Sequence, residues 1–134
     1  MTTLSSMTEE IDSQPPVAER VLIVEDDPAT RSGLAELVQA WGFLTDEAAD
    51  GEEAMRKVTT FRPAIIVSDL VMPRMGGADL LRALKDQLSD ITLILLTAQG
   101  TVDSAVEAIK EGAYDYLSKP VDPQRLQILL QKAV

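Results

Sequence analysis

Short apolar runs alternate with longer amphipathic stretches from residue 21 to the end of the sequence. Three of the runs are four consecutive apolar residues, at 21–24, 64–67 and 93–96. Unbroken apolar runs of this length are typical of parallel strands that are covered on both faces. Two further strands of mixed polarity, suited to the edges of a sheet, are predicted at Phe43–Ala48 and Tyr114–Ser118.

Helix signals fill the intervals between these strands. Asp-Pro pairs at 27–28 and 122–123 are typical helix starts, because Asp caps free amides and Pro suits the first turn. Residues 50–53 resemble a capping box, while Gly42 and Gly112 predict helix ends. Apolar residues at helical spacing mark four of the helices, namely Leu34, Leu37, Val38, Trp41, Leu80, Leu81, Leu84, Val102, Ala105, Val106, Ile109, Leu126, Leu129, Leu130 and Ala133.

Five strand–helix units in succession predict an α/β fold with a parallel sheet. Right-handed crossovers place helices on both faces of such a sheet, so we predict a five-stranded, doubly wound (βα)5 domain over residues 19–134. Residues 1–18 are polar, contain two consecutive prolines and show no apolar period, and we predict a disordered leader there. The leader lacks the basic start and apolar centre of a secretory signal.

Charge and composition narrow the possible chemistry. The 134 residues include 22 Asp and Glu against 12 Lys and Arg, a net charge of −10, which argues against direct binding to nucleic acid or to an anionic membrane. The absence of Cys and His removes disulfides, thiolate nucleophiles and the commonest transition-metal ligand. No apolar stretch approaches the roughly 18–20 residues of a membrane span. We therefore expect a soluble, cytoplasmic protein that uses carboxylates, hydroxyls, lysine and a hard cation.

Candidate chemistry collects directly after the predicted strands. Glu25 and Asp26 follow the first strand, Asp69 the third, Thr97 the fourth and Lys119 the fifth. The carboxyl ends of parallel strands share one edge, where ligands bind in open α/β sheets. Clustered carboxylates need a cation, and an all-oxygen ligand set favours Mg²⁺ or Mn²⁺. Each residue alone is more typical of a cap or a turn, but together they favour a site where an Asp accepts a phosphoryl group.

These segments, in their order and spacing, resemble the receiver (CheY-like) domain of two-component response regulators. The resemblance is carried by residues 21–27, by 66–73 with the Gly76-Gly77 pair, by 95–98 and by 116–120. It covers about residues 19–134 and implies the flavodoxin-like fold already predicted. It also implies a signalling domain that accepts a phosphoryl group from a sensor histidine kinase, catalysing only its own phosphorylation and slow dephosphorylation.

The resemblance assigns roles to individual residues. Asp69 is the implied phosphoacceptor, and Lys119 pairs with the phosphoryl group. Asp26 is implied to bind Mg²⁺ directly and Glu25 chiefly through water, while Asp69 and the backbone carbonyl of Val71 complete the implied metal ligands.

The family's switch is implied for two further residues. The hydroxyl of Thr97 is expected to move toward the phosphoryl group while Tyr116 turns inward. The output is expected on the face formed by the fourth helix, fifth strand and fifth helix. A cis peptide bond is expected between Lys119 and Pro120.

Residues 97–106 and 112–120 look most like the nitrogen-regulation class, in which a receiver controls an AAA+ ATPase domain for sigma-54 promoters and a DNA-binding region. Neither output region is visible in this sequence, which contains no phosphate-binding G-x-x-x-x-G-K-[ST] loop. A homodimer is a further expectation from the family.

Two alternatives stay open. An Mg²⁺-dependent phosphatase can use Asp69 as a turnover nucleophile, although many such enzymes carry a second acid where this chain has Val71. A binding module that works without phosphorylation is the other.

Overall fold

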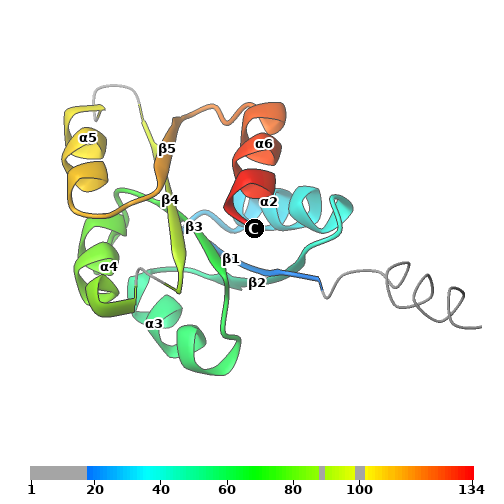
Figure 1. The fold of residues 1–134 in the computed structure, drawn as a ribbon, viewed down its shortest axis with the longest axis horizontal. Coiled ribbons are helices and arrows are strands. Elements are labelled where there is room, and N and C mark those ends of the chain that lie inside the picture. Colours follow the sequence, from blue (N-terminus) through cyan, green and yellow to red (C-terminus); the bar gives the residue numbers. More distant parts are fainter. Residues whose placement is uncertain (1–17, 88–89, 99–101) are drawn as a thin grey trace, which may run out of the picture.

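Five parallel strands form one sheet in the order β2-β1-β3-β4-β5, and helices cover both of its faces (Figure 1). The computed structural model describes residues 18–87, 90–98 and 102–134, so residues 1–17 of the predicted leader lie outside the described residues. The strands are β1 Arg20–Val24, β2 Leu44–Ala48, β3 Ile65–Asp69, β4 Thr92–Thr97 and β5 Asp115–Ser118. The predicted α/β class, strand number and parallel sheet are confirmed.

Five α-helices follow the strands, one after each. They are α2 Pro28–Ala40, α3 Gly51–Thr60, α4 Gly77–Ala83, α5 Val102–Lys110 and α6 Pro123–Ala133. A short 3-10 helix, η1 (Lys85–Gln87), extends α4 and was not predicted. Figure 1 shows α2 and α6 on one face of the sheet and α3, α4 and α5 on the other. This is the predicted doubly wound arrangement. None of the described helices is long and apolar enough to cross a membrane.

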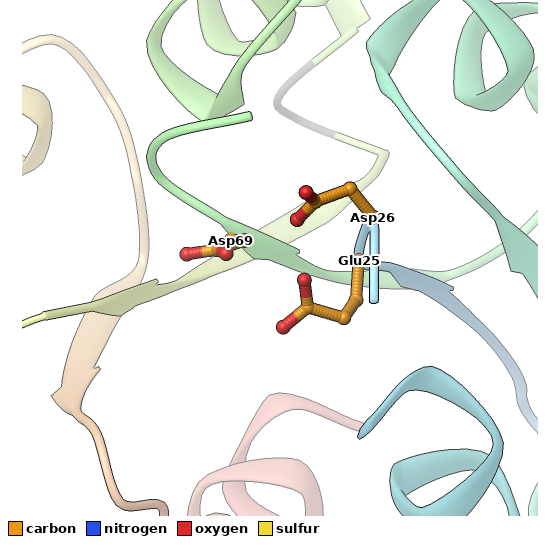
Figure 2. A group of neighbouring side chains, drawn as sticks. All are labelled: Glu25, Asp26 and Asp69. Carbon is orange, nitrogen blue, oxygen red and sulfur yellow. The ribbon is translucent and has the colours of Figure 1, made fainter. Parts of the chain in front are cut away.

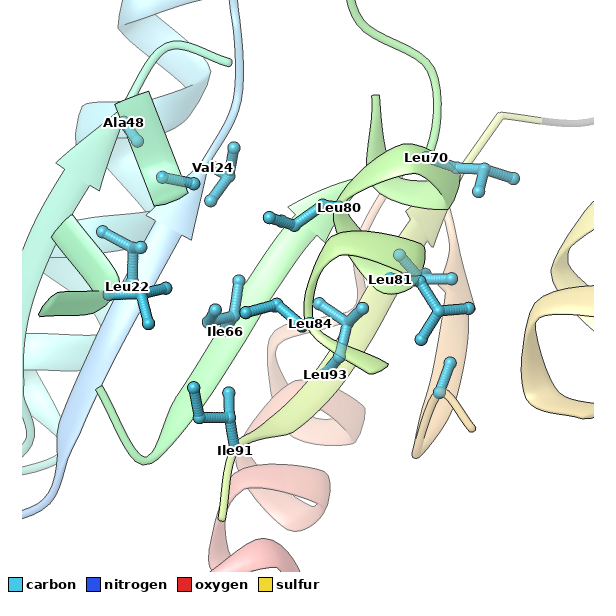
Figure 3. Close-up of a cluster of buried hydrophobic side chains, with 14 of the residues drawn as sticks. Leu22, Val24, Ala48, Ile66, Leu70, Leu80, Leu81, Leu84, Ile91 and Leu93 are labelled. Carbon is cyan, nitrogen blue, oxygen red and sulfur yellow. The ribbon is translucent and has the colours of Figure 1, made fainter. Parts of the chain in front are cut away.

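Alternate residues of each central strand enter opposite cores, because successive side chains of a strand point to opposite faces. In β1, Leu22 packs toward α3 and α4, whereas Ile23 packs toward α2 and α6. Figure 3 shows Ile66, in the core that faces α3 and α4, beside Leu80 of α4 and Leu84, the residue that follows this helix. Since both faces are buried, the central strands need apolar residues at every position, which accounts for their unbroken runs.

The predicted helix caps are present. Asp27 and Asp122 begin α2 and α6, each with a proline directly after it. At α3 the Asp50 Oδ1 accepts from the Glu53 amide at 2.9 Å. The Glu53 carboxylate accepts in return from the amide of Ala49, one residue earlier than a capping box requires.

The two edge strands are shorter than predicted, each beginning one residue later. The amide of Phe43 bonds to the carbonyl of Val38 at the end of α2, so pairing with the sheet starts at Leu44, whose amide bonds to Glu19. Tyr114 precedes β5, and its side chain is exposed. Helix termination and strand initiation therefore overlap at Phe43, and polarity alone does not separate them.

Candidate functional site

The predicted site residues come from four strands and meet at the carboxyl edge of the sheet. Glu25 directly follows β1, Asp69 ends β3, Thr97 ends β4 and Lys119 directly follows β5. Strand register aligns these ends, since Asp69 pairs with Leu96 in the neighbouring strand. The amide of Lys119 also donates to the carbonyl of Thr97 at 2.7 Å, which fixes the last two strand ends together.

Three carboxylates form the centre of the site. Glu25, Asp26 and Asp69 each offer an oxygen, and these oxygens all lie within 4.8 Å of one another (Figure 2). Glu25 is 2% exposed and Asp69 8% exposed, whereas Asp26 reaches solvent. Two buried acids and one exposed acid therefore face a common space that is open on one side.

Lys119 bridges two of these carboxylates. Its Nζ lies 2.9 Å from the Glu25 Oε1 and 2.8 Å from the Asp69 Oδ2. When all four groups are charged, three carboxylates and one ammonium leave a net charge of −2. A divalent cation would neutralise this remainder.

Burial and hydrogen bonding shift the pKa values of the four clustered groups in different directions. Burial raises the pKa of Asp69, and the hydrogen bond from Lys119 offsets this only in part. Hydrogen bonding with Glu25 raises the pKa of Asp26. Burial also acts to raise the pKa of Glu25, but hydrogen bonds with Lys119 and Asp26 bring that pKa below its usual value. Burial acts to lower the pKa of Lys119, yet its bonds to Asp69 and Glu25 raise it.

Thr97 is buried, and among the described residues its Oγ1 has no hydrogen-bond partner. A buried hydroxyl without a partner is costly, so such groups in folded proteins usually serve a purpose beyond stability. Here the hydroxyl is at the same sheet edge as the acids. It is a free donor for a ligand oxygen.

The remaining predicted residues surround this group without joining it. Val71, two residues after Asp69, is 68% exposed, and its apolar side chain offers no ligand atom. Tyr116 is half-buried in β5 and packs against the core that faces α3, α4 and α5. The peptide bond between Lys119 and Pro120 is cis, as the resemblance implied.

Arg31 supports the site and was not among the predicted residues. Its Nη1 donates to the backbone carbonyl of Glu25 at 2.9 Å, and its Nε donates to Glu47 at 3.2 Å. The side chain thereby ties the end of β1 to α2 and β2. An arginine one turn into a helix is usually solvated, so no local pattern signals this contact.

Glycines allow α4 to begin close to the site. A Cβ at Gly77 would lie 2.8 Å from the carbonyl oxygen of Asp69 and 2.8 Å from Leu95. A larger residue there would push α4 away from β3. The Gly76-Gly77 pair therefore permits close packing behind Asp69.

The donor set fits a hard cation. All three acidic side chains offer oxygen, and the chain has no His or Cys to attract a softer metal. Mg²⁺ and Mn²⁺ favour a few carboxylates together with carbonyl and water oxygens. The architecture is that of the flavodoxin-like α/β class, in which ligands bind at this edge of the sheet.

Comparison with known proteins defines the family more closely. The chain belongs to the response regulator receiver domains, whose pattern matches residues 21–131. It is 36% identical over 114 residues to the transcriptional regulatory protein ZraR of Klebsiella oxytoca, covering 85% of this chain and 26% of that protein. It is 32% identical over 114 residues to the DNA-binding transcriptional regulator NtrC of Proteus hauseri, covering 85% and 24%.

A solved receiver domain protein from Clostridium thermocellum superimposes with a TM-score of 0.82 at 31% identity, covering 86% of this chain and 93% of that one. The chain is thus a signalling domain of the two-component type, and the resemblance to the nitrogen-regulation class is confirmed. It spans about a quarter of the length of the two regulators named above.

Proposed function

We propose that this receiver accepts a phosphoryl group on Asp69 from a sensor histidine kinase in an Mg²⁺-dependent reaction. The observation that carries the proposal is the charge of the site. Lys119 pairs with two of the three clustered carboxylates, so a net charge of −2 remains next to Asp69, which matches a divalent cation. Asp26, Asp69, Glu25 (chiefly through water) and the backbone carbonyl of Val71 would hold the metal. Bound Mg²⁺ would supply the charge that neutralises phosphoryl oxygens.

In the transfer, a carboxylate oxygen of Asp69 attacks phosphorus and forms the P–O bond. The P–N bond to the donor imidazole breaks, and its electron pair stays on the imidazole nitrogen. Lys119 already contacts Asp69 and is suited to pair with a phosphoryl oxygen. The absence of His from this chain fits a division of labour in which the donor imidazole belongs to the kinase.

Phosphorylation adds nearly two negative charges to a site that is already acidic. The unpartnered hydroxyl of Thr97 would then turn to a phosphoryl oxygen, and Tyr116 would move toward the space it leaves. Tyr116 belongs to β5, so the change would reach the surface formed by α5, β5 and α6, the face expected to control the output.

The wider setting is also a proposal. Residues 19–134 form the receiver, preceded by a leader over 1–18, in a cytoplasmic protein. The similarity to transcriptional regulators supports an output in transcription, through AAA+ and DNA-binding regions outside this sequence. A homodimer is the assembly that the family resemblance implies. The receiver itself, in a chain with a net charge of −10, would contact neither nucleic acid nor membrane.

The test is incubation with Mg²⁺ and acetyl phosphate, followed by intact mass measurement. We expect one phosphate adduct, stable in acid and labile in base, that is lost in Asp69→Ala and kept in Asp79→Ala, an exposed acid of α4. No adduct under conditions that label another receiver would refute the proposal. Rapid phosphate release without an accumulated adduct would instead indicate a phosphatase.

A further inference from the structure

The segment between β3 and α4, residues 70–76, is a loop closed at its base. The amide of Leu70 donates to Leu96 at 2.8 Å, and the amide of Gly77 donates to the carbonyl of Leu70 at 2.9 Å. A Cβ at Gly76 would lie 2.7 Å from that same carbonyl oxygen. The loop therefore starts and ends at one point beside Asp69, and it contains Val71.

The far side of the loop rests on the first turn of α3. The amide of Gly51 donates to the carbonyl of Met75 at 2.9 Å. A Cβ at residue 51 would lie 2.8 Å from the same oxygen, so this contact requires glycine. The backbone of the loop is thus joined to a helix outside the site.

An ion pair reinforces this contact. The Arg74 Nη2 lies 3.0 Å from the Asp50 Oδ2, while the Asp50 Oδ1 caps α3 through the Glu53 amide. The Asp50 side chain is 9% exposed and that of Arg74 is 70% exposed. Among the described residues, this largely buried carboxylate thus pairs with a cation only from the loop, in a charge-assisted contact that is stronger than one between neutral groups.

The backbone of Arg74 is unusual. Its φ of 68° lies in the left-handed region, and Arg62 is the only other non-glycine residue with a positive φ among the described residues. This conformation costs free energy for a residue with a Cβ and persists when its surroundings hold it. In this conformation the Arg74 guanidinium pairs with Asp50, the N-cap of α3.

We propose that Arg74 is a positioning residue for the metal site. Through Asp50 it clamps the 70–76 loop onto α3 and so holds the Val71 carbonyl at the acidic cluster. The inference rests on the proposed function, because it requires that Mg²⁺ bind there. It predicts that losing a positive charge weakens the binding of a cation, the opposite of what charge alone would do.

The test is a calorimetric titration of the unphosphorylated chain with Mg²⁺, comparing wild type with Arg74→Gly. Glycine adopts a positive φ without strain, so this variant removes the guanidinium and leaves the backbone conformation accessible. We expect the Kd for Mg²⁺ to rise about threefold to fivefold, the scale of a partly exposed ion pair. Amide hydrogen exchange at Gly51 should also become faster, because its acceptor lies in the released loop.

Two variants control for charge and for coupling. Arg82→Ala removes another exposed arginine, paired with Asp79 at the same 3.0 Å, and should leave the Kd unchanged or slightly lower. Asp50→Asn keeps a side chain that caps a helix but removes the charge, and should weaken Mg²⁺ binding as Arg74→Gly does. The double variant should bind no more weakly than either single variant, since both remove one contact.

Each result decides the matter. An unchanged or lower Kd for Mg²⁺ in Arg74→Gly overturns the inference. The proposed function still stands in that case if acetyl phosphate labels Asp69 of the wild-type chain. Additive effects of the two substitutions overturn it as well, because the residues then act separately. A wild-type chain that binds no Mg²⁺ overturns the metal-dependent function, and the inference with it.

Discussion

The bodies of the strands and their carboxyl ends are built from opposite kinds of residue. The central strands supply two apolar cores, with alternate residues on either side of the sheet. Every buried polar side chain identified in residues 18–87, 90–98 and 102–134 instead lies within two residues of a strand's carboxyl end. These side chains are Glu25, Asp50, Ser68, Asp69 and Thr97.

The difference separates stability from chemistry within single strands. Apolar burial in the strand bodies stabilises the fold, at roughly 25 cal/mol for each Å² removed from water. At the ends, buried carboxylates and an unpartnered hydroxyl cost free energy, because folding strips water from groups that are not fully paired. The cores must therefore supply the free energy that the site consumes, and substitutions in the two regions should act in opposite directions.

The largest effect is expected in a strand body. Leu22→Ala removes a fully buried side chain of β1 and should lower the free energy of unfolding by about 2–5 kcal/mol. Urea denaturation measures this change. Leu44→Ala, at an exposed position of β2, should cost under about 0.5 kcal/mol. Equal losses at the two positions would mean that burial does not distinguish them.

A substitution at a strand end should have the opposite sign. Thr97→Val keeps the side-chain shape and removes the hydroxyl that has no partner, so we expect a gain of about 1 kcal/mol in the free energy of unfolding. Thr92→Val, at the half-buried start of the same strand, serves as the matched control and should change stability less. A loss of stability in Thr97→Val would show that the hydroxyl is satisfied in solution.

The smallest effect depends on pH and is measured without Mg²⁺. Because burial raises the pKa of Asp69, with the Lys119 bond offsetting this in part, the folded chain holds that proton more tightly than the unfolded chain. The stability of wild type therefore falls as pH rises from the unfolded pKa of about 3.9 through the raised folded value. Asp69→Asn lacks this loss.

Asp69→Asn should consequently be more stable than wild type at pH 7, and the gap should close as the pH falls below about 3.9. Thermal unfolding across this range measures it. A gap that widens in acid would contradict the raised pKa of Asp69.

The same contrast explains what the sequence could predict. The central strands can be recognised from local composition, because β1, β3 and β4 each contain an unbroken apolar run. The convergence of Glu25, Asp69, Thr97 and Lys119 followed from topology, because parallel strands align their carboxyl ends. The metal-ligand and switch roles came from the family resemblance and stay predictions.

Two long-range contacts could not be predicted from the sequence. The pair between Arg74 and Asp50 depends on a positive φ at an arginine, which no local pattern signals. The support of Glu25 by Arg31 likewise depends on how α2 is placed against β1. Such contacts join segments whose geometry is set only after the sheet has formed.

The bond between Lys119 and Glu25 joins residues 94 positions apart, and the bond to Asp69 spans 50. During synthesis, Glu25 and Asp69 are added to the chain long before Lys119. No fragment that ends before β5 contains the complete site, and contacts of such long range form late because closing the intervening chain costs entropy. The complete constellation therefore exists only once β5, the last strand of the chain, has joined the sheet.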